Sequence, residues 1–255
     1  MNTPDSLPQT PDPWPNQPPP PVLRVQRAIR APSITYLLLA VTVLLFLVQL
    51  AGETLLGADL AAYYGMKINE LILRGQLWRL FTPMFLHGSI LHLLFNMYAL
   101  YQFGRTLEGP YGHGRFLVLY GLSGFTGNVL SFLLAPNPSL GASTAIFGLL
   151  AAEGIFVYRN RQLFGPNAPR VLNNILTVAA INLLLGMSPG IDNWGHIGGL
   201  IGGALFAWFA GPLLRVEGFY PSFQVVDARA TRETLLTGTL VGCLFASLVF
   251  LKMLL

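Results

Sequence analysis

Long apolar segments, separated by shorter polar connections, limit what this chain can fold into. There are seven of them, and they occupy residues 33–50, 89–103, 116–134, 143–158, 171–185, 194–214 and 235–255. An apolar run of about 17 to 25 residues can cross a bilayer as a helix. Hydrophobic residues make up 53% of the chain and charged residues only 10%, so a water-soluble core could not bury this much apolar surface. We therefore predict an all-α, polytopic membrane protein.

The polar stretches divide the chain into a tail, a core and an added helix. Residues 1–30 begin with a stretch rich in Pro, Gln, Asn and Asp that has no apolar periodicity, which predicts a disordered cytoplasmic tail. Residues 31–216 hold the first six apolar segments and form the predicted core. Residues 217–255 comprise a polar linker and a seventh transmembrane helix, which is predicted to be separable from the other six.

The connection at residues 51–87 mixes apolar pairs with charged residues. It is too polar to span a bilayer and too apolar to be a free loop. Short amphipathic helices that lie in the membrane interface are therefore expected.

Basic residues predict the orientation. Eleven Lys and Arg residues fall on the side of the N-terminus and four fall on the other side. Because cytoplasmic loops carry the excess of basic residues, the N-terminus is expected in the cytoplasm and the C-terminus outside. The basic residues are scattered in loops, so the formal net charge of +4 does not predict a nucleic-acid partner. The single cysteine fits a bacterial plasma membrane without excluding an organelle.

Four polar residues are predicted to share one depth in the membrane. In this topology the second, fourth and sixth segments all begin on the outer side. His92 and Asn96 come early in the second segment, Ser143 opens the fourth, and His196 comes early in the sixth. Polar side chains are costly in hydrocarbon and usually face a protein interior or a water-filled cavity. Four at one depth therefore predict a functional site.

The segments that carry Ser143 and His196 are suited to close packing and to charge stabilisation. At a helix N-terminus, free N–H groups and the helix dipole favour negative charge, although a serine there can be a simple N-cap. In the sixth segment Gly195, Gly199 and Gly203 recur every four residues, a spacing that lets two helices approach closely. If the partner is the fourth helix, His196 comes within hydrogen-bond reach of Ser143.

These motifs resemble those of the rhomboid family of intramembrane serine proteases. The resemblance covers residues 33–214 and rests on Trp78-Arg79, His92-x-x-x-Asn96, Gly141-Ala142-Ser143 and Gly195-His196-x-x-Gly199-x-x-x-Gly203, in that order. It implies a rhomboid-like bundle of six helices, to which a seventh C-terminal transmembrane helix is added here. It also implies a serine endopeptidase without a cofactor or metal, which hydrolyses peptide bonds in or near the transmembrane segments of other membrane proteins.

The resemblance assigns roles to the four polar residues. Ser143 is the expected nucleophile and His196 its general base, with no third carboxylate. The backbone N–H of Ser143 and the side chains of His92 and Asn96 are expected to hold the oxyanion.

Further residues are expected to support this site. Family resemblance places Phe147 against the ring of His196, and we count Gly141 and Gly199 as supporting positions. The pair Trp78-Arg79 is expected to seat the first loop in the outer leaflet.

One residue departs from the family pattern. The usual motif is Gly-x-Ser-Gly, and Thr144 stands here in place of the second glycine. We expect activity to be retained, because the helical backbone needed after Ser143 is open to threonine. The alternative is a non-catalytic, rhomboid-like protein that retains or escorts membrane clients, and Thr144 is the only feature that favours it. A small-solute transporter would need intramembrane charges or paired discontinuous helices, which the sequence does not indicate.

Other residues could be mistaken for site residues. Ser123, in Gly121-Leu122-Ser123-Gly124, matches the family motif better than Ser143 does, but its segment begins on the cytoplasmic side. Asp192 precedes His196 by four residues and is expected to be a helix cap or a surface charge. His87 and His92 lack the carboxylate or cysteine that would complete a metal site, so His87 is expected to be structural.

Overall fold

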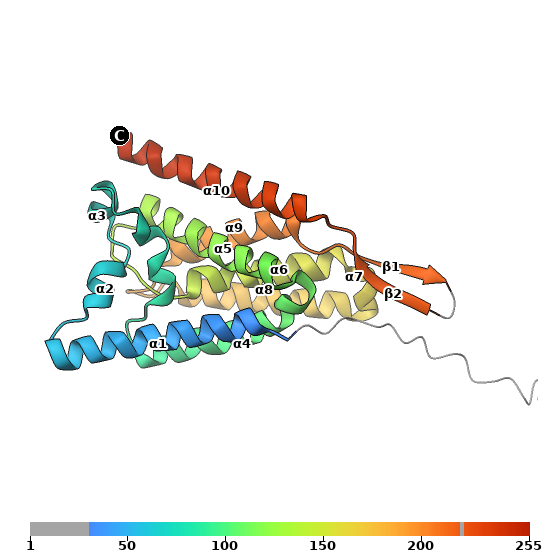
Figure 1. Ribbon diagram of the computed structural model, residues 1–255, viewed down its shortest axis with the longest axis horizontal. Coiled ribbons are helices and arrows are strands. Elements are labelled where there is room, and N and C mark those ends of the chain that lie inside the picture. The colour runs from blue at the N-terminus through green and yellow to red at the C-terminus, as the bar shows by residue number, and fades with distance from the viewer. Residues whose placement is uncertain (1–30, 220–221) are drawn as a thin grey trace, which may run out of the picture.

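The protein is described from a computed structural model that covers residues 31–219 and 222–255. The predicted tail, residues 1–30, lies outside the described residues. Seven helices of 17 residues or more occur in the described part, and they are α1 (Ser33–Leu56), α4 (Ile90–Tyr111), α5 (His113–Leu134), α6 (Ser143–Arg159), α8 (Ala168–Leu185), α9 (Asn193–Ala210) and α10 (Thr231–Leu254). They lie lengthwise beside one another in a bundle (Figure 1). Each coincides with one predicted apolar segment, so the all-α, polytopic membrane fold is confirmed.

Within residues 31–219 and 222–255, four helical stretches are long and apolar enough to cross a membrane, namely residues 33–56, 113–134, 161–185 and 231–254. The last 18 of the 25 residues in the third stretch form α8, which follows the short helices α7 (Arg161–Phe164) and η3 (Gly165–Asn167). Helix α6 has only 17 residues, which gives about 26 Å at the helical rise, and this is less than the roughly 30 Å core of a bilayer. Its buried residues occupy most of its length, so α6 is surrounded by protein rather than by lipid.

Short helices form the first loop, as the mixed polar and apolar pattern predicts. They are α2 (Leu60–Gly65), α3 (Asn69–Leu73), η1 (Leu77–Leu80) and η2 (Thr82–Phe85). The buried guanidinium of Arg79 donates to the carbonyls of Tyr63 and Met66 and to the Oε1 of Gln76. These bonds satisfy a charge that is removed from water and connect three turns of the loop. The neighbouring indole of Trp78 is half-exposed and donates to the Tyr64 carbonyl.

A buried carboxylate joins α1 to α4. Glu108 is 0% exposed and accepts hydrogen bonds from the backbone N–H groups of Ile34 and Thr35, from the Thr35 hydroxyl, and it pairs with His113. The two N–H groups belong to the first turn of α1, where the helix dipole favours a negative charge. This contact explains why α4 continues to Tyr111, whereas the apolar pattern predicts an end at Phe103.

A β-hairpin was not predicted. Strands β1 (Leu214–Phe219) and β2 (Ser222–Asp227) pair antiparallel and project from the end of the bundle opposite to α2 and α3 (Figure 1). The predicted end of the sixth segment is also wrong. Helix α9 stops at Ala210 instead of Leu214, because Gly211-Pro212 cannot continue the helix. The Asp227 carboxylate pairs with Arg115 of α5 and thereby anchors the hairpin to the bundle.

The glycines of α9 bring it against two other helices. A Cβ on Gly199 would overlap the backbone carbonyl of Thr144, and a Cβ on Gly203 would overlap the carbonyl of Gly148, both in α6. A Cβ on Gly202 would overlap the side chain of Thr126 in α5. The predicted packing of the glycine-rich helix against the helix of Ser143 is therefore present, and it permits backbone-to-backbone contact.

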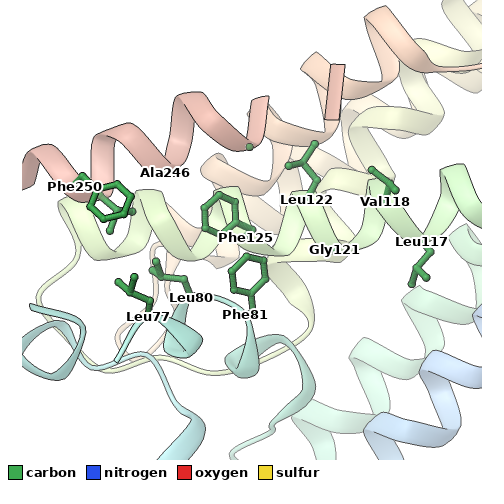
Figure 2. A pocket seen from close by; sticks show the side chains of 12 residues that line it. Leu77, Leu80, Phe81, Leu117, Val118, Gly121, Leu122, Phe125, Ala246 and Phe250 are labelled. Carbon is green, nitrogen blue, oxygen red and sulfur yellow. The ribbon is translucent and has the colours of Figure 1, made fainter. Parts of the chain in front are cut away.

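Helix α10 packs along α5 and α9 and leaves an apolar groove of about 600 Å³ beside them. The groove is lined by the first loop, α5 and α10 (Figure 2), where Phe81 and Phe125 stack with their ring centroids 4.7 Å apart. Its lining residues are apolar and include none of the four predicted polar site residues. The groove resembles a lipid-facing surface, and its lining residues have no polar side chain that could take part in catalysis.

We predict that Gly199→Ala destabilises the protein by about 1–3 kcal/mol, because the added methyl group meets a backbone carbonyl that cannot yield without separating α6 from α9. Thermal unfolding in detergent measures this loss. Gly121→Ala in α5 is the matched control, since a Cβ there meets nothing within 4 Å, and alanine favours the helix by up to about 1 kcal/mol. Equal stability of the two variants would contradict the tight packing of α9.

Candidate active site

Ser143 and His196 are in direct contact. Ser143 is the first residue of α6, and His196 lies in the first turn of α9. The Nε2 of His196 and the Oγ of Ser143 are 2.9 Å apart, within hydrogen-bond distance, and His196 is only 8% exposed. The Oγ of a serine beside an imidazole nitrogen is the arrangement that lets the imidazole accept the hydroxyl proton. The spacing of the glycines in α9 predicts this contact, and the structure contains it.

Phe147 holds the plane of the imidazole. Its ring stacks on His196 with the centroids 4.1 Å apart and the planes 11° from parallel. Phe147 is one helical turn beyond Ser143, so α6 supplies both the hydroxyl and the surface on which the histidine rests. Rotation of the imidazole out of the hydrogen bond to Ser143 would break this stacking.

The other imidazole nitrogen has no carboxylate partner. Across residues 31–219 and 222–255, the buried Nδ1 of His196 makes no hydrogen bond. Asp192 instead caps α9, where its carboxylate accepts the N–H of Gly195 at 3.0 Å. Asp192 is therefore a helix cap, as expected, and the described part of the chain contains a serine–histidine pair without a third member.

His92 lies beside the nucleophile. Gly141 adopts φ of +139°, a backbone conformation open mainly to glycine. A Cβ at this position would lie 2.7 Å from the Cε1 of His92 and 3.7 Å from the Oγ of Ser143. The imidazole of His92 thus occupies the space that the missing side chain of Gly141 leaves open.

Asn96 is on the same face of α4 as His92, as their spacing of four residues predicts. Its Nδ2 donates to the backbone carbonyl of His92 at 2.9 Å, and the side chain is buried. An amide nitrogen carries two protons, so one remains for another acceptor. The backbone N–H of Ser143 is also free of the α6 ladder, because the first N–H groups of a helix have no intrahelical acceptor.

The loop before Ser143 is held by the first loop of the protein. Lys67 and Ser139 exchange two backbone hydrogen bonds, of 2.9 and 3.1 Å, and the N–H of Gly141 donates to the carbonyl of Pro83 at 2.9 Å. The Nζ of Lys67 donates to the carbonyl of Ala135 at 3.0 Å. Burial lowers the pKa of Lys67 to about 8, and the amine remains a donor in either protonation state. Sequence reasoning did not single out Lys67, because backbone pairing between two loops leaves no local pattern.

His87 supports the same loop. It is 1% exposed, and its Nε2 accepts the backbone N–H of Ala142 at 3.4 Å. Burial, with a smaller contribution from His92, lowers the pKa of His87 to about 3, so the ring is neutral at physiological pH and can act as an acceptor. His87 therefore has the structural environment that was expected of it. Groups of three or more potential metal ligands are absent from the part of the chain that the structure describes.

Thr144 faces the neighbouring helices, where glycines make room for it. A Cβ on Gly127 of α5 would lie 2.6 Å from the Cβ of Thr144, and a Cβ on Gly195 of α9 would lie 3.0 Å from its Cγ2. The side chain is buried, and its hydroxyl has no hydrogen-bond partner among the described residues. The bulk of the threonine is therefore accommodated by packing between α5 and α9.

We predict that Thr144→Val preserves stability and activity, because the valine has the same branched shape and the hydroxyl makes no bond. Thr144→Gly is expected to cost about 1–2 kcal/mol through the lost methyl contacts and the lower helix propensity. Thermal unfolding and cleavage rates of both variants test this. A wild-type protein that is inert and becomes active as Thr144→Gly would contradict it.

The fold and the site define a class: a polytopic helical membrane protein with a serine–histidine pair at the start of two packed helices. A family model described as the Rhomboid domain matches residues 74–213, more than half of the chain. The chain therefore belongs to the rhomboid family, and the resemblance drawn from the motifs is confirmed.

Several curated proteins are similar to this chain. Rhomboid protease GluP of Bacillus subtilis (strain 168) is 41% identical over 219 residues, which cover 85% of this chain and 41% of GluP. RHOMBOID-like protein 9, chloroplastic, of Arabidopsis thaliana is 35% identical over 159 residues, which cover 62% of this chain and 37% of the relative. YdcA of Bacillus subtilis (strain 168) is 32% identical over 180 residues, covering 69% of this chain and 87% of YdcA. The chain thus spans less than half the length of the first two relatives.

Proposed function

We propose that this chain is an intramembrane serine endopeptidase that hydrolyses peptide bonds in or near the transmembrane segments of membrane-protein substrates. The observation that carries the proposal is the 2.9 Å contact between Ser143 and His196 at the N-terminus of a buried helix. Membership of the rhomboid family and the similarity to a relative named rhomboid protease support it. The substrates reach the site from the lipid bilayer, and no cofactor takes part.

The chemistry follows from the positions of the two side chains. His196 accepts the proton of Ser143 as the Oγ attacks the peptide carbonyl, and it returns that proton to the nitrogen of the leaving amine. In the second half of the reaction, His196 accepts a proton from a water molecule that attacks the acyl-enzyme, and it returns the proton to the Oγ of Ser143 as the acid product leaves. An extended backbone must reach Ser143, so substrates with small, helix-breaking residues near the outer end of their helix are favoured.

The oxyanion is assigned to three donors. They are the backbone N–H of Ser143, at the positive end of the α6 dipole, and the side chains of His92 and Asn96. His92 is beside Ser143, against Gly141, and Asn96 keeps one amide proton for the oxyanion when the other bonds to its own helix.

The distribution of basic residues supports an orientation. The protein is proposed to lie in a bacterial plasma membrane with its N-terminus in the cytoplasm and its C-terminus outside. The hairpin, which contains Arg215 and is followed by Arg229, is then on the cytoplasmic side, and the first loop is on the outer side with the site.

We predict that Ser143→Ala and His196→Ala each abolish cleavage of a single-span membrane substrate by the purified protein in detergent. Each removes one partner of the proposed dyad, and losses of 10³-fold or more are expected. Ser123→Ala is the matched control, since Ser123 lies in the better sequence match to the family motif yet its buried hydroxyl makes no hydrogen bond within the described residues. It should cleave as the wild type does.

The same experiment distinguishes the protease from the alternative, a non-catalytic protein that escorts membrane clients. A wild-type protein that binds several substrates and cuts none would support the escort reading, and the protease proposal would then be wrong. Loss of activity in Ser123→Ala with retention in Ser143→Ala would place the nucleophile elsewhere.

We predict that Asn96→Ala lowers kcat by about 10- to 1,000-fold with a smaller change in KM, because an oxyanion donor acts mainly in the transition state. Steady-state cleavage kinetics measure the split. Asn182→Ala in α8 is a suitable control, because Asn182 makes the same bond to the carbonyl four residues earlier but is exposed. An unchanged kcat in Asn96→Ala would remove Asn96 from the oxyanion site.

A further inference from the structure

The carboxylate of Asp192 is fixed more firmly than a helix cap requires. Besides the N–H of Gly195, it accepts the hydroxyl of Ser131 from the last turn of α5. The backbone N–H of His196 donates to the Asp192 carbonyl at 3.2 Å, so the carboxylate belongs to the turn that carries the histidine. Two hydrogen bonds from two helices therefore hold a negative charge one turn before His196.

The neighbouring cations do not form an ion pair with this carboxylate. Lys67 in the first loop bonds to the carbonyl of Ala135, and Lys252 of α10 bonds to the carbonyls of Phe132 and Leu133 at 2.7 and 3.0 Å. Both ammonium groups thus cap the C-terminal end of α5, where carbonyls are unsatisfied. Among the described residues, neither lysine forms a salt bridge to Asp192.

The charges around the dyad are few. His196 interacts electrostatically with Asp192 and with His92 of α4, while Ser143 and Phe147 of α6 contact it directly. Lys67 interacts electrostatically with Asp192, and also with Lys252 and Glu70. Asp192 is the negative charge in this group that interacts with the imidazole, and burial of the His196 ring limits the screening of this interaction by water.

We propose that Asp192 is a positioning residue whose fixed negative charge stabilises the His196 imidazolium during catalysis without touching the ring. The inference rests on the proposed protease function and deepens it. The proton moves from the Oγ of Ser143 to the Nε2 of His196 and then to the leaving amine, and Asp192 never accepts it. The carboxylate thus does at a distance what a third triad member does by contact with Nδ1.

Asp192→Asn tests the charge alone. Asparagine is as good an N-cap as aspartate, and its carbonyl oxygen can accept the bond from Gly195 or from Ser131, so the helix start is kept. Loss of the negative charge disfavours the protonated imidazole. The acid limb of the pH profile of kcat/KM, which requires neutral His196, therefore moves to lower pH by about 0.5–1 unit, and kcat falls about 10-fold.

Two further variants separate charge from structure. Asp192→Ser keeps the cap and also removes the charge, so its pH profile should shift as that of Asp192→Asn does. Ser131→Ala keeps both the charge and the cap, so its acid limb should stay in place. If Asp192→Asn retains the wild-type pH profile, or loses thermal stability and activity without a shift, Asp192 is only a cap and the proposal is wrong.

A readout without turnover keeps this test independent of the protease proposal. In the Ser143→Ala background, the pH midpoint of the His196 imidazole signal is measured by NMR with labelled histidine, with and without Asp192→Asn. A lower midpoint in the double variant supports the electrostatic coupling even if no substrate is found. An unchanged midpoint overturns it even if the wild type is an active protease.

Discussion

Backbone contact between α6 and α9 is the constraint on which the site depends. The two helices can come this close only because Gly199 and Gly203 present no side chain to the carbonyls of Thr144 and Gly148. That approach brings the imidazole of His196 to 2.9 Å from the Ser143 hydroxyl and onto the ring of Phe147. A methyl group at this interface would separate the two helices by more than the tolerance of a hydrogen bond.

The end of α5 connects the remaining elements to this pair. Lys252 of α10 and Lys67 of the first loop bond to carbonyls at that end, while its Ser131 bonds to the cap of α9. Lys67 also pairs with the loop that leads to Ser143. The nucleophile and the histidine are thus positioned from the same end of α5. The seventh helix, α10, also contacts this end, in addition to its apolar packing.

Thr144 illustrates how a departure from a motif is absorbed by packing. The family pattern has a glycine after the serine, and here the glycines at positions 127 and 195 lie opposite the threonine instead. The side chain of Thr144 fills the space that these two glycines leave between α5, α6 and α9, so the packing stays dense. A motif read along one helix does not reveal this, because the compensating positions are on two others.

Hydropathy alone determined the seven helices, since apolar runs of spanning length have few other stable folds. The spacing of four residues placed His92 and Asn96 on one face of their helix and aligned the glycines of α9 on one face of theirs. The motifs also identified the family. The extension of α4 to Tyr111 and the position of the hairpin were decided by contacts between distant residues, such as Glu108 with the start of α1 and Asp227 with Arg115. The hydrogen bonds of Lys67, Ser131 and Lys252 also join residues that are far apart in the sequence. Local pattern reports which face of an element is apolar, whereas the partner of a buried polar group depends on which segments the tertiary fold brings together.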